Sequence, residues 1–446
     1  MIKDKKNIYI KTFGCQMNEY DSNRIYDSVS KLGFVKTINQ SNADCYILNT
    51  CHIRDKAKEK VYHEIGRVKK LYRDKIKPIM VVAGCVAQAE NEEMIKREPY
   101  IDIILGPQSY HKVNDLLKNH IVSLKQEETE FDTISKFGYF DKIKNNNDKI
   151  SAFLTIQEGC DKFCKFCVVP YTRGSEFSRS LKELISEANQ LVENGAREIT
   201  LLGQNVNAYN FETKRLSDLI LEISKIKDLK RIRYTTSHPI DFKDDLVEVH
   251  KNCEKLMPFI HLPVQSGSNK ILKEMNRKHN IKQYLKVIEK LKKVKPNIEF
   301  SSDFIIGYPG ESYDDFKKTI ELMNKVKFIN SYSFVYSARP GTPAYSLENI
   351  NHSDAKKRLM EFQNIAEKIK SKYRNQLVNK ISTVLFENKT KIENKYFGRD
   401  EYFNSVIVKS EIDLVGKIKN VKVLEINQNT LFGEVISNFD QKDYAA

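Results

Sequence analysis

The sequence has 446 residues, of which 40% are apolar and 30% are charged, and its formal net charge is +15. No stretch approaches the ~20 apolar residues of a membrane span, and the N-terminal residues lack the apolar run of a signal peptide, so we expect a cytoplasmic protein without a membrane partner. In such a protein eight cysteines indicate metal or redox chemistry rather than disulfides, and the excess of Lys and Arg favours an anionic partner, nucleic acid first.

The first 125 residues alternate predicted strands with predicted helices, which indicates a parallel sheet. The strands are predicted at residues 7–12, 44–49 and 78–83, and the helices at 21–32, 53–71 and up to 92. Cys15, Cys51 and Cys85 each follow one of these strands. Because ligands bind at the carboxyl ends of the strands in such sheets, the three thiols are expected to converge on an iron–sulfur cluster with one open iron. The alternative is three unrelated buried or free cysteines.

Residues 126–150 are polar and lack periodicity, so we predict a linker between residues 1–125 and a second domain at 151–375. The second domain holds six strand-like segments, each ending in a polar or Gly-rich turn. They lie at residues 151–157, 198–202, 231–235, 259–262, 299–306 and 331–336. This rhythm predicts an open, partial (β/α)6 barrel whose chemistry lies at the carboxyl ends of the strands. An open side suits a macromolecular substrate.

Three more cysteines, Cys160, Cys164 and Cys167, lie in the turn after the first of these strands, with gaps of three and two residues. Three thiolates so close together fit three irons of one cubane cluster and leave the fourth iron open. A structural zinc site and an ordinary electron-transfer cluster both take four protein ligands. The incomplete set therefore indicates chemistry at the open iron. The alternative is a zinc site that takes a distant fourth ligand.

Residues 376–446 change to short strands of alternating apolar residues. These are predicted at 382–386, 405–408, 416–426 and 431–435 and indicate a small antiparallel β-barrel. Barrels of this kind bind oligonucleotides, but its near-neutral charge argues against a purely electrostatic contact with RNA. A basic run at residues 270–295 is either a track for phosphates or a solvated helix face.

Several motifs together resemble the radical S-adenosylmethionine methylthiotransferases. They lie at residues 13–18, 49–54, 84–88, 159–174, 261–268 and 336–343. The resemblance covers the whole chain and implies a methylthiotransferase domain, a radical S-adenosylmethionine domain and a C-terminal TRAM domain that holds RNA. Gln16-Met17-Asn18 after the first cysteine is similar to the branch that modifies isopentenylated adenosine. The alternatives are the branches that act on threonylcarbamoyladenosine in tRNA or on ribosomal protein S12.

The resemblance implies an enzyme with two 4Fe–4S clusters, on Cys15, Cys51 and Cys85 and on Cys160, Cys164 and Cys167. It would join a methylthio group to carbon 2 of N(6)-isopentenyladenosine beside the anticodon. One S-adenosylmethionine would supply the methyl group, and a second would be cleaved to a radical. The implied partners are a tRNA anticodon stem-loop and an electron donor such as flavodoxin or ferredoxin, and the implied state is a monomer.

The resemblance also implies contacts with S-adenosylmethionine. These residues sit at strand ends, where ordinary turn chemistry is the alternative: Gly203, Gln204, Ser237 and Gln265. Arg173 and Arg179 are predicted to contact RNA, because arginine presents a planar fork of donors to phosphate, although each fits a surface cation equally well. Cys45 and Cys253 match no motif and are interpreted as small buried apolar residues. A non-catalytic iron–sulfur RNA-binding protein is the alternative from another class.

Overall fold

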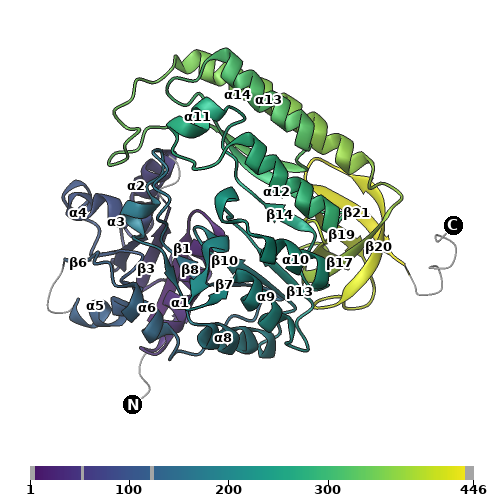
Figure 1. The fold of residues 1–446 in the computed structure, drawn as a ribbon. Helices are drawn as coiled ribbons and strands as arrows, with labels where there is room; N and C mark the ends of the chain where they lie inside the picture. Colours follow the sequence, from purple (N-terminus) through teal and green to yellow (C-terminus); the bar gives the residue numbers. More distant parts are fainter. Residues whose placement is uncertain (1–5, 52–54, 121–124, 437–446) are drawn as a thin grey trace.

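The computed structural model describes residues 6–51, 55–120 and 125–436 of the chain. An N-terminal α/β region, a central partial barrel and a C-terminal β-barrel follow one another in the colours of the sequence, from purple to yellow (Figure 1). His52, Ile53 and Arg54 of the second motif lie outside the described residues. Among the described helices, none has the length and apolar character needed to cross a bilayer.

The N-terminal region is built on a six-stranded parallel sheet in the order β2-β1-β3-β4-β5-β6. Its strands are β1 (Lys6–Thr12), β2 (Phe34–Lys36), β3 (Cys45–Thr50), β4 (Ile79–Gly84), β5 (Ile103–Leu105) and β6 (Gln126–Glu128). Its helices are α1 (Gln16–Ser30), α2 (Asp55–Leu71), α3 (Cys85–Glu90), α4 (Glu92–Arg97), η1 (Tyr110–Lys112), α5 (Val113–Asn119) and α6 (Thr133–Phe140).

Strand β3 lies in the middle of this sheet and is buried along its whole length. Cys45 and Ile47 face the core that α1 and α5 share, whereas Tyr46 and Leu48 face the core beneath α2. A strand covered on both faces reads as a continuous apolar run, which is why the sequence predicted it. Cys45 is fully buried, and Cys253 is buried in the core of the central region, as expected for small apolar residues.

The structure differs from the predicted elements in three places here. Helix α1 begins at Gln16, directly after Cys15, rather than at residue 21. The strands β2, β5 and β6 were missed because each has three residues, too few to show a pattern. The predicted linker at 126–150 is wrong for this segment, which holds β6 and α6. Strand β6 pairs with β5 through its backbone and needs no apolar pattern, and α6 is capped by Asp132 and buries Phe137 and Phe140.

The central region is the predicted partial barrel, with six parallel strands in chain order. They form the sheets β13-β10-β7 and β14-β15-β16, and a parallel bridge between Ile232 and Leu256 joins the two. The strands are β7 (Ser151–Thr155), β10 (Glu198–Leu202), β13 (Arg231–Tyr234), β14 (Phe259–His261), β15 (Glu299–Ile306) and β16 (Asn330–Val335). In the described residues β7 and β16 do not pair, so the barrel is open.

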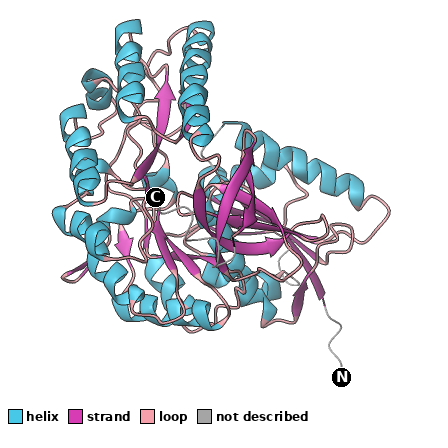
Figure 2. Ribbon diagram, turned by 90° about the vertical axis from the view of Figure 1, so that its right-hand side faces the viewer, coloured by secondary structure: helices cyan, strands magenta, loops and turns pink. Residues whose placement is uncertain are grey.

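Most helices of the region lie outside these strands (Figure 2), whereas α7 (Val169–Thr172) lies at the mouth of the barrel. The other helices are α8 (Leu181–Glu193), η2 (Val206–Ala208), α9 (Leu216–Ser224), η3 (Pro239–Asp241), α10 (Asp244–Asn252), α11 (Asn269–Glu274), α12 (Ile281–Val294), α13 (Tyr313–Val326) and α14 (His352–Asn375). Two short ribbons, β8 (Gln157–Glu158) with β9 (Phe177–Ser178) and β11 (Asn210–Phe211) with β12 (Lys214–Arg215), complete the region.

The C-terminal region is a closed barrel in the order β17-β18-β19-β21-β20. Its strands are β17 (Ile381–Lys389), β18 (Lys395–Arg399), β19 (Ser405–Lys409), β20 (Ile418–Ile426) and β21 (Thr430–Val435). Strand β18 was missed because Gly398 occupies one of its two buried positions and removes the apolar alternation. The barrel is antiparallel as predicted except between β19 and β21, which are parallel.

Two arginines of β13 attach this barrel to the central region. Arg231 donates to the main-chain oxygens of Arg399 and Thr383 at 2.9 and 2.7 Å. Arg233 donates to those of Glu401 and Asp400, both at 2.8 Å. The contact fixes the barrel at the amino-terminal end of β13, away from the predicted site.

Candidate active site

Both cysteine trios line a single cavity of about 320 Å³ between the N-terminal region and the mouth of the partial barrel. The sequence predicted the first trio from three strand ends and the second from its spacing within one turn, and the structure brings the two together. The cysteines that line the cavity are Cys15, Cys51, Cys85, Cys160, Cys164 and Cys167. None of the eight cysteines forms a disulfide in the described residues.

The first trio sits where β1, β3 and β4 end. Cys15 is the residue before α1, Cys51 follows β3 directly, and Cys85 is the first residue of α3. Asn18 ties two of these turns together, since its Nδ2 donates to the main-chain oxygens of Phe13 and Thr50 at 2.8 and 2.9 Å. Asn18 belongs to a motif found in the sequence, but the motif did not predict that its side chain joins the two turns.

Hydrogen bonding and charge favour the thiolate form in part of this trio. A hydrogen bond with Cys51 lowers the pKa of Cys15 to about 6, and the cation of Arg173 acts in the same direction. Burial raises the pKa of Cys85, against a smaller lowering by Arg173. Metal ligation requires the thiolate, so Cys15 is better prepared for it than Cys85.

The second trio lies on the loop between β8 and α7. The main-chain N–H of Cys160 donates to Gly174 at 3.1 Å, and that of Cys167 donates to Cys164 at 2.9 Å. Burial raises the pKa of Cys160 and of Cys167 to about 12, so a bound metal would have to displace their protons.

Arg277 is a residue of this site that sequence reasoning missed. Its Nη1 lies 3.5 Å from the Sγ of Cys164, and its Nη2 donates to the main-chain oxygen of Pro263 at 2.6 Å. The sequence placed Arg277 only within a basic run, because the distance from residue 164 to residue 277 along the chain hides the contact.

No three His, Cys, Asp or Glu side chains of the described ranges are grouped as they would be around one metal ion. A cubane places each thiolate on a different iron, so its ligands stand farther apart. The fit therefore rests on the donor set itself, three soft thiolates from three strand ends and three from one loop around a single cavity.

The residues predicted to contact S-adenosylmethionine all line the same cavity: Gly203, Gln204, Ser237 and Gln265. The Oε1 of Gln204 accepts from the main-chain N–H of Gly159 at 2.6 Å. The Oγ of Ser237, the Oδ1 of Asn205 and the Nε2 of His238 are buried without a hydrogen-bond partner in the described part of the chain. Unpaired polar atoms that face a cavity fit a polar ligand such as S-adenosylmethionine.

His238 is held neutral in this wall. Burial lowers the pKa of its imidazole far below the usual range, and Arg277 and His279 act in the same direction. Its Nδ1 accepts from the main-chain N–H of Ile240 at 3.3 Å, which leaves the proton on Nε2, directed away from the turn.

Arg173 and Arg179 do not lie where we expected them. Both side chains are buried, at 3% and 1% exposure, and both are paired with carboxylates inside the protein. Arg173 Nη2 lies 2.7 Å from Asp21, and Arg179 Nη1 lies 2.8 Å from Glu187. Guanidinium groups held in buried ion pairs are not free to reach a phosphate here, so this structure does not support the expected contact with RNA.

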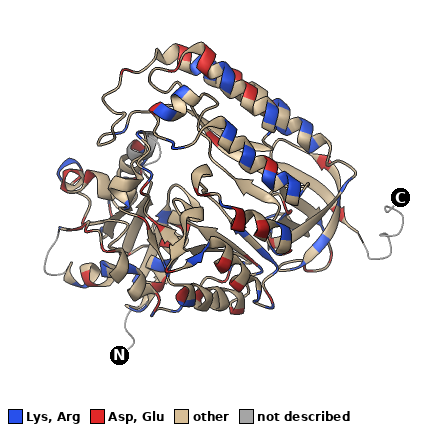
Figure 3. Cartoon of the chain, in the orientation of Figure 1, with Lys and Arg blue, Asp and Glu red and all other residues tan. Residues whose placement is uncertain are grey.

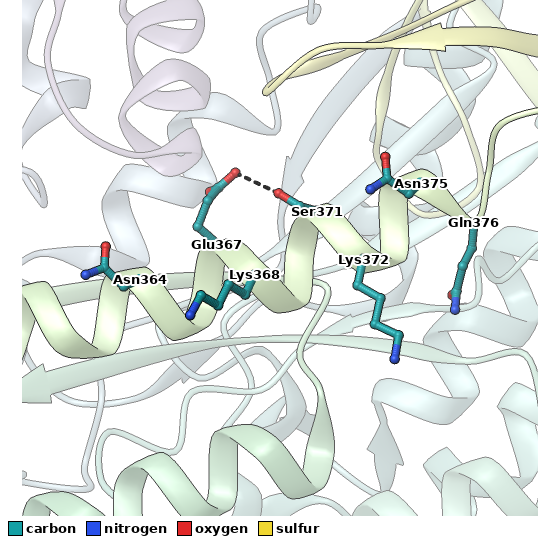
Figure 4. A pocket seen from close by; sticks show the side chains of 7 residues that line it. All are labelled: Asn364, Glu367, Lys368, Ser371, Lys372, Asn375 and Gln376. Atoms are coloured by element: carbon teal, nitrogen blue, oxygen red, sulfur yellow. Dashed lines mark hydrogen bonds between the residues drawn. The ribbon is translucent and has the colours of Figure 1, made fainter.

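A larger and more open hollow, of about 760 Å³, follows the second half of α14. Glu367, Ser371 and Asn375 share one side of the helix, and Lys368 and Lys372 point to the other (Figure 4). Ser371 donates to Glu367 at 3.4 Å, and no cysteine lines the hollow. We therefore place the candidate active site at the smaller cavity with the cysteines.

Comparison with family models divides the chain into three matches. Residues 7–106 match the uncharacterized protein family UPF0004, residues 154–323 the radical SAM superfamily, and residues 375–436 the TRAM domain. The first match ends at β5 and the second begins within β7, so the segment with β6 and α6 lies between them.

Curated relatives match the chain over nearly its whole length. A tRNA-2-methylthio-N(6)-dimethylallyladenosine synthase of Pelagibacter ubique is 61% identical and covers 98% of this chain and 99% of its own. A protein of the same name from Wolbachia pipientis subsp. Culex pipiens is 49% identical and covers 96% of this chain and 99% of its own.

Two solved structures share the fold. The radical S-adenosylmethionine methyltransferase TsrM of Kitasatospora setae, with cobalamin and a 4Fe–4S cluster bound, has a TM-score of 0.56 at 10% identity, over 76% of this chain and 77% of its own. The cobalamin-dependent S-adenosylmethionine radical enzyme OxsB has a TM-score of 0.50 at 13% identity, over 82% of this chain and 56% of its own. At this identity the likeness shows the architecture alone.

Proposed function

Because the chain belongs to the family of the tRNA-2-methylthio-N(6)-dimethylallyladenosine synthases, we infer that it transfers a methylthio group to carbon 2 of N(6)-dimethylallyladenosine, also called isopentenyladenosine, in tRNA. The observation that carries this function is the meeting of two cysteine trios in one cavity. The reaction needs a radical source and a sulfur source at the same base. Carbon 2 carries an unactivated C–H bond, which no side-chain acid or base is strong enough to open.

We propose that each trio holds one 4Fe–4S cluster and leaves one iron without a protein ligand. The clusters and S-adenosylmethionine, when bound, supply the radical, the sulfur and the methyl group. The chain's own part is to hold the thiolates in place. Asn18 fixes the turns of Cys15 and Cys51 to each other, and Gln204 fixes the main-chain N–H of Gly159 beside Cys160. Gln204 also contacts Met17, so it links the two trios.

Gly203, Gln204, Ser237 and Gln265 are proposed to bind S-adenosylmethionine beside the second trio. Their place in the cavity wall supports this, as does the unpaired Oγ of Ser237. The main chain of Gln265 pairs with Asp303 and Ile305, so this residue stands on the rigid edge of β15 rather than on a free loop. A site built on rigid elements orients its ligand better than one built on a loop.

The proposed macromolecular partner is the anticodon stem-loop of tRNA, and the TRAM domain supports RNA binding. Lys and Arg gather along α12 and α14 on the outside of the central region (Figure 3). These cations offer contacts to phosphates that the near-neutral barrel lacks. We further propose a cytoplasmic monomer that receives electrons from a flavodoxin or a ferredoxin.

Mass spectrometry of tRNA nucleosides from a deletion strain tests the substrate. We expect 2-methylthio-N(6)-dimethylallyladenosine to disappear, to return with the wild-type gene or with Cys45→Ala, and to stay absent with Cys51→Ala. Cys45 is the matched control, because it lies on the strand that leads to Cys51 but faces the core. An unchanged nucleoside in the deletion strain would reject this substrate. Loss of methylthiolation from threonylcarbamoyladenosine or from ribosomal protein S12 would assign one of the alternatives.

Iron and sulfide analysis after anaerobic reconstitution tests the cofactors. We expect two 4Fe–4S clusters per chain, and one cluster after Cys51→Ala. Release of 5′-deoxyadenosine from S-adenosylmethionine under reducing conditions separates an enzyme from a non-catalytic iron–sulfur RNA-binding protein. Intact clusters that release none would favour the latter.

A further inference from the structure

Arg173 is a buried cation that stands between the two cysteine trios. We propose that Arg173 is an electrostatic positioning residue for the cluster on Cys15, Cys51 and Cys85, and that its charge stabilises the reduced form of that cluster. This inference rests on the proposed function, in that it takes the first trio to hold a cluster.

Both ends of Arg173 are fixed against the N-terminal region, although the residue belongs to the loop that follows the second trio. Its Nη2 donates to Asp21 at 2.7 Å and to Asn18 at 3.2 Å, and both partners lie on α1. Its main-chain oxygen accepts from Gln108 at 2.8 Å. A side chain held at both ends has one position, so its charge has a fixed distance to the cysteines.

The free face of the guanidinium is turned toward the first trio. Arg173 lines the cavity and interacts with the Cys85 thiol. Its Nη1 is buried, lies 3.4 Å from Glu158, and has no hydrogen-bond partner in the described part of the chain. A guanidinium that interacts with a cysteine of the trio is a donor from which cluster sulfur can accept a hydrogen bond. Hydrogen bonds to sulfur and the local net charge both set the reduction potential of such clusters.

The buried charged side chains next to the first trio are two carboxylates and two cations, so their net charge is zero. Asp21 and Glu158 are the carboxylates, and Arg173 and Lys136 are the cations. Lys136 Nζ lies 2.6 Å from Glu158 and 3.6 Å from Asp21. Removal of the Arg173 charge would leave a net negative charge in a buried place. An added electron would then be repelled, so the cluster would become harder to reduce.

Arg179 is a matched control for Arg173. It is equally buried, lies six residues farther along the chain, and pairs with Glu187 and Asp141. It does not line the cavity with the cysteines. Arg179→Gln therefore removes a buried cation of the same kind without a change of charge beside the first trio.

The test is a redox titration of the full chain in which Cys160, Cys164 and Cys167 are replaced by alanine, so that one cluster remains. Against this parent we expect Arg173→Gln to lower the ratio of reduced to oxidised cluster at least tenfold at a given potential, a shift of about 59 mV for one electron. Arg173→Lys should lower the reduction potential less, and Arg179→Gln should leave the potential unchanged. Asp21→Asn should raise the potential. Thermal unfolding of the cluster-free proteins measures stability separately, and we expect similar losses for the two arginine variants.

An unchanged potential in Arg173→Gln with its cluster intact overturns the inference. If Arg173→Gln does not retain a cluster, Asp21→Asn decides: an upward shift supports the role of charge, and no shift overturns it. A parent that takes up no cluster overturns the two-cluster proposal and this inference with it. If the parent takes up a cluster and none of the variants changes its reduction potential, the proposed function stands and only the role of Arg173 is removed.

Discussion

Gly14 decides how closely the first two turns of the candidate site approach each other. Its φ is +111°, and a Cβ at this position would lie 2.3 Å from the Cβ of Cys51 and 2.9 Å from its Sγ. A residue with a side chain therefore meets two costs here, a backbone conformation that L residues rarely adopt and a clash with a cysteine of the trio.

We predict that Gly14→Ala destabilises the chain and abolishes uptake of the first cluster. Backbone strain of about 1–3 kcal/mol adds to overpacking of about 1–3 kcal/mol. Gly33→Ala is the control, because Gly33 also has a positive φ, +87°, but no atom lies within 4 Å of its added Cβ. It should show the strain alone. Urea unfolding and iron content measure the two effects, and full iron uptake by Gly14→Ala would contradict the steric argument.

At the scale of residues, the sequence predicted the parts of the site that carry their own spacing. The six cysteines could be found because the first trio follows three successive strands and the second has close, regular spacing within one turn. Arg277 could not be found, because its contact with Cys164 spans more than a hundred residues. The ion pair of Arg173 with Asp21 could not be found either, since a sequence does not show that an arginine is buried.

At the scale of elements, β13 does more than complete the partial barrel. Its two arginines supply donors to four main-chain oxygens of the C-terminal barrel. Arg233 also pairs with the buried Glu198 of β10 at 2.9 Å, whereas Arg231 has no carboxylate as a salt-bridge partner in the described ranges. A neutral residue at position 233 would therefore leave a buried carboxylate without its ion-pair partner, whereas one at position 231 would not.

We predict that Arg233→Met destabilises the chain more than Arg231→Met. The former leaves Glu198 as an uncompensated buried charge, which costs about 3–5 kcal/mol. Each variant also leaves two main-chain oxygens without their charged donor, at about 1–3 kcal/mol each, so this loss is common to both and only the charge of Glu198 separates them. Arg215→Met, at a half-exposed ion pair with Asp245, should cost less than about 1 kcal/mol. Unfolding curves and limited proteolysis between α14 and β17 measure the effects, and equal losses at residues 231 and 233 would contradict the argument.

Which elements the sequence could predict depended on where their stability comes from. The central strands were placed to within one or two residues, because each ends in a polar or Gly-rich turn. Strand β6 could not be predicted, because its polar residues are held by backbone pairing with β5. Helix α6 could not either, because the apolar face that it buries lies in a short segment between two polar runs.

At the scale of the whole molecule, the site exists because two regions are held face to face by polar contacts. Tyr20 of α1 donates to Glu187 of α8 at 3.1 Å, and Asp21 pairs with Arg173. Such buried pairs hold geometry more than they add stability. Replacement of one member should therefore disturb the distance between the trios as well as the fold. Sequence patterns describe each region alone and carry no signal for such a charged interface.

The stability of the whole chain should also fall in mild acid, because the central region buries neutral histidines. His250 of α10 is 1% exposed, and its Nε2 shares a hydrogen bond of 2.6 Å with the hydroxyl of Tyr234. Burial lowers the pKa of His250 from 6.5 to about 3, and Lys295 contributes in the same direction. Between these values the unfolded chain binds a proton that the folded chain does not, so the free energy of unfolding falls as the pH falls from 6.5 toward 3.

We predict that His250→Gln removes about 2 kcal/mol of the stability that the cluster-free protein loses between pH 7 and pH 5, because glutamine does not titrate and still offers Tyr234 an acceptor. His352→Gln, at an exposed position at the start of α14, is the control and should keep the full pH dependence of the parent. Urea unfolding at several pH values measures the slope. The same slope in His250→Gln and in the parent would contradict this prediction. It would show that His250 gains its proton in the folded chain, through a local opening of α10. The buried hydrogen bond with Tyr234 is expected to prevent that opening.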